Sequence, residues 1–174
     1  MLGFDIENVK KVMNELLMKD TFDELLFFEG NLKSLFEFRF DGRKNELFEE
    51  RLKASNSLTA EEQNNLLLME GEELVCWGMA RPKIFELIKG KCTPQSFSFV
   101  LMLNRKVKQQ LADKNDFKAF ASKGNNYCLN FRFEKNVLKV TTATSLESFT
   151  MDKNFDKIWD GYVNEKYSNV LTTC

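Results

Sequence analysis

The chain has 174 residues, of which 43% are hydrophobic, and it contains 17 Phe but only 2 Pro and 8 Gly. This composition is typical of a folded globular protein and excludes a linker or a disordered tail. No apolar run approaches the roughly 18 residues of a membrane span, and the first residues lack the basic and apolar regions of a signal peptide. We therefore expect a folded cytoplasmic protein with no membrane partner.

Side chains that carry common chemistry are few. The sequence contains no histidine, which removes the commonest general base, the usual catalytic triads and most zinc and iron sites. The cysteines Cys76, Cys92, Cys128 and Cys174 lack CxxC spacing, so we expect free thiols rather than disulfides or a zinc site. No glycine-rich phosphate loop, GxSxG or EF-hand spacing is present. The sequence thus predicts no catalytic residue, no metal site and no cofactor.

The charge is split along the chain. Residues 1–74 carry 9 basic and 17 acidic groups, a net charge of −8, whereas residues 75–174 carry 16 basic and 9 acidic groups, a net charge of +7. Residues 81–139 alone carry 13 basic and 4 acidic groups, a net charge of +9. Such a split indicates a basic face for a polyanion, two halves that attract each other, or a solvated surface and nothing more.

The N-terminal part predicts a helix followed by a hairpin. Asp5 is a good N-cap for a helix that ends near residue 20, with an apolar stripe on one face. Residues 24–28 predict a short strand and 29–31 a turn. Residues 32–41 then predict a second strand that carries Phe36, Phe38 and Phe40 on one side.

Residues 43–75 predict a helical insertion. Residues 46–52 have the pattern of a short amphipathic helix, and 54–57 are a polar break. Thr59 and Glu62 have capping-box spacing and open a second helix. Much of the negative charge of the chain lies here.

The next part alternates helices and strands. Pro82 after Arg81 predicts a helix start, and Gly90 predicts its end. Residues 96–103 predict a strand that is central in its sheet. Asn104 is a cap for a basic helix with Val107 and Leu111 on its inner face. The inward residues expected of the first helix are Ile84, Phe85, Leu87 and Ile88.

The clearest β signal is a hairpin over residues 127–144. Apolar and polar residues alternate along 127–134, and Lys135 with Asn136 makes a two-residue turn. That turn sets the register and places Arg132 opposite Lys139 on the outer face, where screening by Glu134 or solvent, or a ligand anion, would relieve the repulsion. The remaining pairs are Phe133–Leu138, Phe131–Val140, Leu129–Thr142, Asn130–Thr141 and Cys128–Ala143.

The C-terminal part predicts a strand, a helix and a tail. Residues 148–151 predict a short strand, Asp152 a helix cap, and 168–174 a tail. Trp159 lies in an apolar stripe with helical spacing and is expected to dock on the sheet. The other members of the stripe are Phe155, Ile158, Tyr162 and Val163.

An internal duplication is a further hypothesis. Residues 28–33 resemble 133–139, and residues 34–41 resemble 145–152 with Ser, Leu, Phe and Asp at the same spacing. Residues 1–42 would then be one repeat and 95–167 the other, within a single domain over 1–174. The alternative is that Phe-rich hairpins look alike by composition.

Two resemblances to known families are present. Residues 77–82, 85–90, 93–94, 141–153 and 159–160 resemble a family of uncharacterised proteins from Gram-positive anaerobes, which implies no functional residue. The order of strand, basic helix, hairpin and further strand, given twice, is similar to the repeat of DNA sliding clamps. That likeness implies DNA-facing helices, namely 105–113 and an N-terminal counterpart with Lys10 and Lys11. No motif matches, and two repeats close a ring only if chains assemble.

Together these patterns predict an α+β domain with an antiparallel sheet and packed helices. The function that we expect is a non-catalytic cytosolic binding or assembly module, with an unidentified protein partner or self-association. One alternative is a clamp-like nucleic-acid-binding protein that uses the basic 81–139 region. Another is an enzyme that acts on an anionic substrate without histidine. The residues predicted to bind nucleic acid are Arg105, Lys106, Lys108, Arg132 and Lys139.

Overall fold

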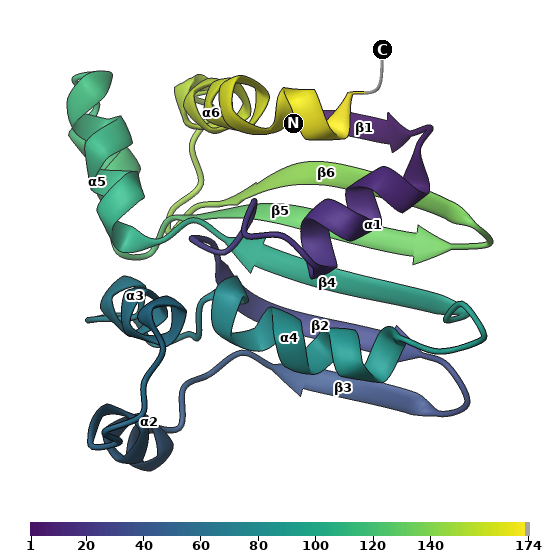
Figure 1. Cartoon of the computed structure of the whole chain (residues 1–174). Coiled ribbons are helices and arrows are strands. Elements are labelled where there is room, and N and C mark those ends of the chain that lie inside the picture. The colour runs from purple at the N-terminus through teal and green to yellow at the C-terminus, as the bar shows by residue number, and fades with distance from the viewer. Residues whose placement is uncertain (173–174) are drawn as a thin grey trace.

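Six strands form one antiparallel sheet in the computed structural model, which describes residues 1–172 (Figure 1). The strands lie in the order β1-β6-β5-β4-β2-β3, and every neighbouring pair is antiparallel. The predicted α+β class and antiparallel sheet are confirmed. The strands are β1 (Gly3–Ile6), β2 (Leu26–Lys33), β3 (Glu37–Asp41), β4 (Ser96–Met102), β5 (Asn126–Glu134) and β6 (Val137–Ser145).

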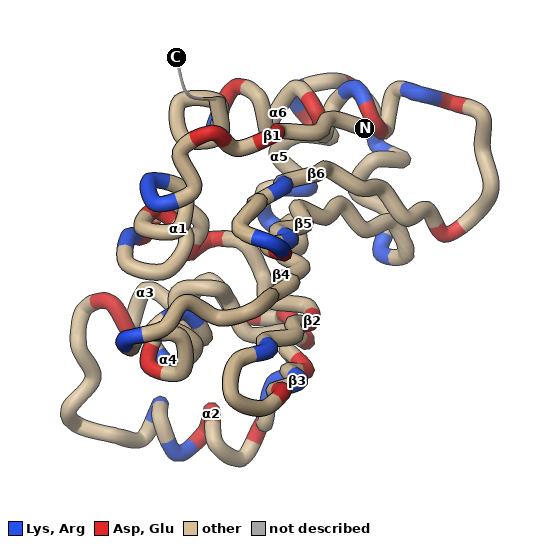
Figure 2. Tube along the Cα trace, turned by 90° about the vertical axis from the view of Figure 1, so that its right-hand side faces the viewer, with Lys and Arg blue, Asp and Glu red and all other residues tan. Residues whose placement is uncertain are grey.

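The helices lie over one face of the sheet and at its borders. Helices α1, α4 and α6 lie across this face, here called the inner face, while α5 lies at one end and α2 and α3 lie toward the β3 side (Figure 1). The opposite face is here called the outer face. In the side view of Figure 2, α1 and α4 lie on one side of β2 and β3, and no labelled helix lies on the other side of these two strands. The helices are α1 (Val9–Leu17), α2 (Glu46–Lys53), α3 (Ala60–Leu68), α4 (Trp77–Ile88), α5 (Arg105–Lys114) and α6 (Asn154–Leu171), with a short 3-10 helix over Lys118–Ala121.

In the described part of the chain, no helix combines the length and the apolar character that a bilayer crossing requires. The thiols of Cys76, Cys92 and Cys128 are free, as predicted, while Cys174 lies outside the described residues.

The β5–β6 hairpin has the predicted turn and register. Lys135 and Asn136 have φ angles of 53° and 63°, the left-handed values that a type I′ loop requires at both positions. Alternation of side chains then places apolar residues on the inner face and polar residues on the outer face. All six predicted cross-strand pairs occur: Phe133–Leu138, Phe131–Val140, Leu129–Thr142, Arg132–Lys139, Asn130–Thr141 and Cys128–Ala143.

The core lies between the inner face and the helices. Trp77 of α4 and Trp159 of α6 are fully buried. The indole N–H of Trp77 donates to the Leu16 carbonyl at 2.7 Å, and that of Trp159 donates to the Cys128 carbonyl at 3.1 Å. Each tryptophan therefore fixes its helix by packing and by one satisfied hydrogen bond. The predicted core role of Trp159 is confirmed, as is the central position of β4.

Gly30 lies inside strand β2, so the predicted turn at 29–31 is wrong. The hairpin closes instead after Lys33, where the Ser34 N–H bonds to the Phe36 carbonyl. A Cβ atom at Gly30 would lie 2.8 Å from a ring atom of Phe99 and 2.9 Å from one of Phe27. Two core rings thus pack directly against the backbone of Gly30. Glycine is needed at this position because a side chain would not fit, and not because the chain turns there.

Two predicted helix starts are wrong. Asp5 lies in β1, a strand that the sequence did not predict, and Asn8 is the N-cap of α1. Helix α4 begins at Trp77, so Pro82 lies inside the helix rather than at its start. Because Pro82 lacks an N–H group, the helix lacks one backbone hydrogen bond there.

The C-terminal segment also differs from the prediction. Residues 148–151 are not a strand, because β6 ends at Ser145 and an irregular segment leads to α6. Asp152 accepts a hydrogen bond from the Asn154 N–H at 2.9 Å, although Lys153 is the N-cap of α6. The prediction of a tail from residue 168 is wrong at its start, because α6 continues to Leu171, which is buried. Residues 173–174 of the predicted tail lie outside the described part of the chain.

The duplication stays a prediction. The order strand, helix, strand, strand occurs twice, as β1-α1-β2-β3 and as β4-α5-β5-β6. The pairing differs, because β4 pairs with β5 of its own set whereas β1 pairs with β6 of the other. The matched segments 34–41 and 145–152 also differ, since only the first contains a strand after its turn.

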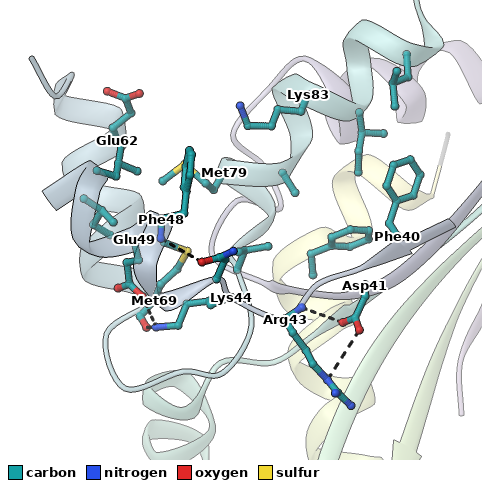
Figure 3. A pocket seen from close by; sticks show the side chains of 18 of the residues that line it. Phe40, Asp41, Arg43, Lys44, Phe48, Glu49, Glu62, Met69, Met79 and Lys83 are labelled. Carbon is teal, nitrogen blue, oxygen red and sulfur yellow. Dashed lines mark hydrogen bonds and ion pairs between the residues drawn. The ribbon is translucent and has the colours of Figure 1, made fainter. Parts of the chain in front are cut away.

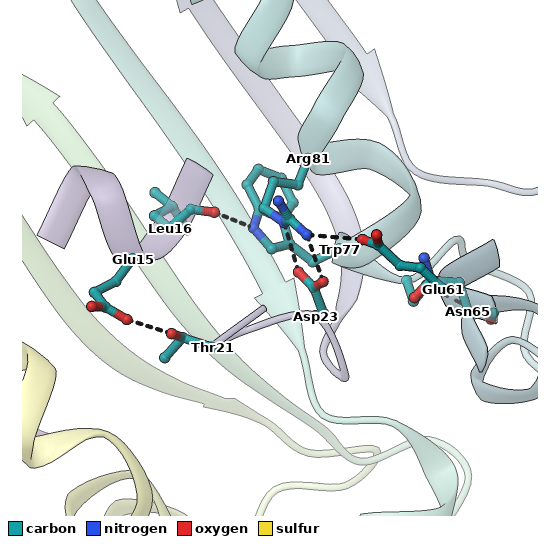
Figure 4. Close-up of polar contacts among 9 residues, drawn as sticks. Glu15, Leu16, Thr21, Asp23, Glu61, Asn65, Trp77 and Arg81 are labelled. Carbon is teal, nitrogen blue, oxygen red and sulfur yellow. Dashed lines mark hydrogen bonds and ion pairs between the residues drawn. The ribbon is translucent and has the colours of Figure 1, made fainter. Parts of the chain in front are cut away.

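A buried ion pair anchors α4 and α3 to the loop after α1 (Figure 4). Arg81 donates from Nε and Nη2 to the two carboxylate oxygens of Asp23, each at 2.8 Å, and both residues are buried. The same Nη2 lies 3.2 Å from Glu61 of α3. A bidentate, charge-assisted contact therefore connects three segments that are far apart in the sequence.

Candidate functional site

A cleft of about 780 Å³ lies beside edge strand β3, between α2, α3 and α4 (Figure 3). Phe40 of β3 lies at one side of it, Met79 of α4 and Met69 at the other, and Phe48 of α2 points toward Met79. The lining is mainly apolar. Its apolar members are Phe27, Phe40, Phe48, Leu52, Leu66, Met69, Val75, Met79, Ala80, Ile84 and Leu87.

The cleft exists because the helix layer ends before the sheet does. Ile84 of α4 is 3% exposed, but Leu87, one turn further, is 40% exposed, so the prediction that Leu87 packs inward is wrong. Helix α2 buries none of its residues, and its Phe48 is 61% exposed. Apolar side chains that a closed core would cover therefore line a space that is open to solvent.

The charges at the α2 end of the cleft are paired. Lys44 Nζ lies 2.9 Å from Glu49 and donates to the Met69 carbonyl at 3.1 Å, and Lys53 Nζ lies 2.8 Å from the same carboxylate. Hydrogen bonds from Lys53 and Lys44 hold the pKa of Glu49 below its ordinary value. Glu49 is therefore an ionised anchor of α2, whereas a general acid needs a raised pKa.

The rim carries both signs of charge. Lys83 of α4 is exposed and has no ion pair within residues 1–172, while Arg43 Nε lies 3.9 Å from Asp41. Glu62 belongs to the capping box of α3, in which its carboxylate accepts from the Thr59 N–H and its own N–H donates to the Thr59 hydroxyl. The predicted capping box is confirmed, and Glu62 is committed to it.

Strand β3 borders the cleft and has no strand on its other side among the described residues. The Phe36 carbonyl and the Gly42 N–H both bond toward β2, so the even-numbered residues of β3 face that strand. Because bonded and non-bonded pairs alternate in an antiparallel ladder, the backbone groups of Glu37, Arg39 and Asp41 point away from the sheet. A free strand edge beside an apolar cleft is the arrangement that binds an extended peptide.

The sequence predicted part of this site. The expected row of Phe36, Phe38 and Phe40 forms, with ring centroids 4.5 Å and 6.3 Å apart, but Phe36 lies in the turn before β3 rather than in the strand. The cleft was missed, because it forms only where the insertion meets α4 and β3. The amphipathic pattern of 46–52, which puts Phe48 on an apolar side with no assigned cover, was the available signal.

The five cations predicted to bind nucleic acid do not lie on one surface. Arg105, Lys106 and Lys108 are in α5, at one end of the sheet, whereas Arg132 and Lys139 are on the outer face near the tip of the β5–β6 hairpin (Figure 1). Arg105 and Lys106 are exposed.

A carboxylate of the insertion meets the start of α5. The Arg105 N–H donates to Glu72 at 2.7 Å, so Glu72 occupies the helix N-terminus that a phosphate would otherwise approach. On α1, Lys10 and Lys11 are exposed, and Lys11 Nζ donates to the Asn169 carbonyl at 3.0 Å.

Lys108 differs from the other four predicted cations because it is buried. It is 7% exposed, and its Nζ donates to the carbonyls of Ser122 and Asn125 at 2.9 Å and 3.0 Å. Burial lowers the pKa of its amine. Its position, three and four residues before Leu111 and Ala112 on the buried side of α5, places it on the inner stripe that the helical period defines.

Lys108→Met is expected to lower the free energy of unfolding by about 2–4 kcal/mol, because two buried carbonyls lose a charged donor. The exposed neighbour gives the matched control, and Lys106→Met should change stability by less than about 0.5 kcal/mol. Urea unfolding followed by circular dichroism measures both. Equal stability of the two variants would contradict the buried role of Lys108.

Arg132 and Lys139 lie directly opposite each other, and each has an acidic neighbour. Arg132 Nη2 lies 3.3 Å from Glu134, which confirms the predicted screening by that residue. Lys139 Nζ lies 3.8 Å from Asp5 of β1, a partner that was missed together with its strand. Two carboxylates thus offset the repulsion, and a ligand anion is not needed to explain it.

Part of the charge difference between residues 1–74 and 75–174 is neutralised by ion pairs within the molecule. Several ion pairs join an acid of residues 1–74 to a base of residues 75–174, as the alternative of two attracting halves requires. On the outer face, by contrast, residues of both signs are interspersed, among them Asp5, Glu37, Arg39, Arg132 and Lys139. The pairs across the split are Asp5–Lys139, Asp23–Arg81, Glu61–Arg81 and Glu24–Lys166.

A family model matches residues 15–169, which is most of the chain. The chain belongs to the family of unknown function DUF5721. The expected membership in an uncharacterised family is therefore confirmed, while its origin in Gram-positive anaerobes stays a prediction. Comparison with curated proteins and with solved structures gives no match, so the likeness to sliding clamps also stays a prediction. The description of DUF5721 names no activity, and the candidate site rests on geometry.

Proposed function

We propose that this member of DUF5721 is a non-catalytic cytosolic binding and assembly module, which binds an extended, partly apolar segment of a protein along β3. The observation that carries the proposal is the free edge of β3 directly beside the apolar cleft. Neither feature alone identifies a partner, but together they offer backbone hydrogen bonds and pockets for side chains to the same ligand.

The geometry of a strand explains how both features are used at once. Side chains of an added strand alternate between the two faces of the sheet. Those on the inner side would lie next to Phe38 and Phe40, of which Phe40 lines the cleft, and those on the outer side would meet solvent and Arg39. The cleft volume of about 780 Å³ falls within the range of about 300–1,000 Å³ that ligand sites occupy.

The alternatives have less support from the same residues. For an enzyme, the three carboxylates that line the cleft already have partners. Glu49 is paired with two lysines, Glu62 caps α3, and Asp41 accepts a hydrogen bond from the Arg43 N–H. No group of three or more potential metal ligands occurs among residues 1–172. For a nucleic-acid-binding protein, Lys108 is buried and the remaining cations are divided between two places in the fold.

Peptide selection with the purified chain tests the proposal. Random peptides displayed on phage are selected for binding to the chain, and the affinity of the selected peptides is measured with a fluorescent label by anisotropy. We expect the selected peptides to have alternating apolar residues. The double variant Phe48→Asp with Leu87→Asp should bind them at least tenfold more weakly, a loss of about 1.4 kcal/mol or more in binding free energy. Both side chains are exposed, so this variant should fold.

The control replaces an exposed apolar residue elsewhere. Val137 at the hairpin tip is exposed and does not line the cleft, so Val137→Asp should bind the peptides as the unmodified chain does. A selection that enriches no peptide, or peptides that bind the double variant equally well, would overturn the proposal.

A further inference from the structure

We infer that the segment bound along β3 is β3 of a second copy of this chain, so that two sheets join edge to edge in antiparallel pairing. The inference rests on the proposed function, because it names the occupant of the same edge and cleft. A two-fold arrangement of this kind is self-complementary, with the same patch on both chains, and is the commonest form of homodimer.

The first support is that the backbone of this edge is open to pairing. Natural sheets protect exposed edges with short strands, charged side chains, proline, bulges or a covering element, and of these β3 has only its five-residue length and its charged side chains. Residues 37–41 contain no proline, and their pairing with β2 shows no bulge. The outward backbone groups of Glu37, Arg39 and Asp41 are therefore ready to pair with a strand that presents the same spacing.

The second support is the charge pattern on the outer side of β3. Glu37, Arg39 and Asp41 alternate in sign. Pairing centred on Arg39 would place Arg39 opposite itself and Glu37 opposite Asp41, and like charges directly opposite each other are destabilising. Pairing centred on Phe38 instead places Glu37 opposite Arg39 on both sides of the axis.

A centre at Phe40 is also complementary, because it places Arg39 opposite Asp41 and Glu37 opposite Arg43. In both of these registers odd-numbered residues face odd-numbered residues, so the outward backbone groups meet. Within one chain, Arg39 Nε already donates to Glu37 at 3.2 Å, and pairing would exchange this exposed contact for one across the interface.

The third support is the aromatic row on the inner side. Phe36 is 62% exposed and lies 4.5 Å from Phe38, ring centroid to ring centroid, and the row continues to Phe40. With the centre at Phe38, that residue faces its own copy, and Phe36 faces Phe40 of the second copy. Aromatic cross-strand pairs stabilise a sheet, and here Phe36 of the second copy would lie next to Phe40, which lines the cleft.

Sedimentation velocity over a range of concentrations tests the inference. We expect the unmodified chain to dimerise, and Arg39→Glu to weaken dimerisation at least tenfold, because the new acid at position 39 would face Glu37 with the centre at Phe38 and Asp41 with the centre at Phe40. The side chains of residues 37, 39 and 41 are exposed, so the variants should fold, which circular dichroism checks.

Mixing variants identifies the register. With the centre at Phe38, Arg39→Glu and Glu37→Arg should each fail to self-associate but form a heterodimer when mixed. With the centre at Phe40, Arg39→Glu should pair instead with Asp41→Arg. Formation of either heterodimer supports the inference, because a merely structural effect of the substitutions would not be restored by mixing.

Two results would overturn it. One is an unmodified chain that stays monomeric at every concentration, and the other is a dimer that persists in Arg39→Glu, which would place the interface elsewhere. Binding of the selected peptides separates the two proposals. If the chain is a monomer that binds the peptides, only the inference of a second copy as partner is contradicted. If it is a monomer that binds no peptide, the proposed function is contradicted as well.

Discussion

Arg81→Ala is expected to lower the free energy of unfolding by about 3–5 kcal/mol, because it leaves the carboxylate of Asp23 buried without its partner. Both side chains are buried, and two hydrogen bonds of 2.8 Å join them. The loss should extend to the candidate site, since Arg81 also contacts Glu61 of α3, which forms one wall of the cleft. Peptide affinity should therefore fall together with stability.

Urea unfolding of this variant is compared with that of Arg105→Ala. Arg105 is exposed, so its replacement should change stability by less than about 0.5 kcal/mol. In the double variant Arg81→Met with Asp23→Leu, no buried charge is left unpaired, because Glu61 is exposed to solvent, and part of the lost stability should return. A loss below about 1 kcal/mol in Arg81→Ala would show that the pair is not the anchor described here.

Gly42→Ala is the second change from which we expect a large effect, a loss of more than about 3 kcal/mol. A Cβ atom at this position would lie 1.6 Å from the Phe27 carbonyl oxygen and 2.6 Å from its carbon. These are backbone atoms, so only a shift of the chain relieves the overlap. That shift would break the hydrogen bonds of 2.9 Å that join Gly42 to Phe28 and Val75.

Thermal unfolding of Gly42→Ala and Gly161→Ala makes the comparison. Gly161 lies in α6, and a Cβ atom there would meet nothing within 4 Å. Alanine should therefore raise stability at this position by up to about 1 kcal/mol, through its higher helix propensity. A Gly42→Ala variant as stable as the unmodified chain would contradict the close approach of β3 to β2.

Local signals in the sequence were reliable where the cause of the structure is local. The period of two in 127–134 and the turn at Lys135 and Asn136 gave the whole register of the hairpin. Side-chain caps at Asn104 and Thr59 gave the starts of α5 and α3. Each of these features depends on contacts within a few residues, which a pattern records.

Features with distant causes were not predictable. Strand β1 has four residues and is held by pairing with β6, which lies more than 130 residues further along the chain. Gly30 looks like a turn residue because its reason, the rings of Phe27 and Phe99, is tertiary. Lys108 looked exposed because it stands among other cations, although its helical position already placed it on the inner face.

The candidate site shows the same division. The aromatic row of β3 follows from alternation in 36–40 and was expected. The cleft requires α2, α3 and α4 to stand at a certain distance from β3, and no periodicity in 43–75 fixes that distance. The free edge depends on strand order, which places β3 last in the sheet although it is third in the sequence.

Hydrogen–deuterium exchange at the backbone amides of β3 tests the central claim most directly. The amides of Glu37, Arg39 and Asp41 point outward, so they should exchange rapidly in dilute protein, whereas those of Phe38 and Phe40 face β2 and should be protected. At high protein concentration, or with a selected peptide, we expect the three outward amides to become protected. Unchanged exchange of these amides under both conditions would contradict the assignment of β3 and its cleft as a protein-binding site.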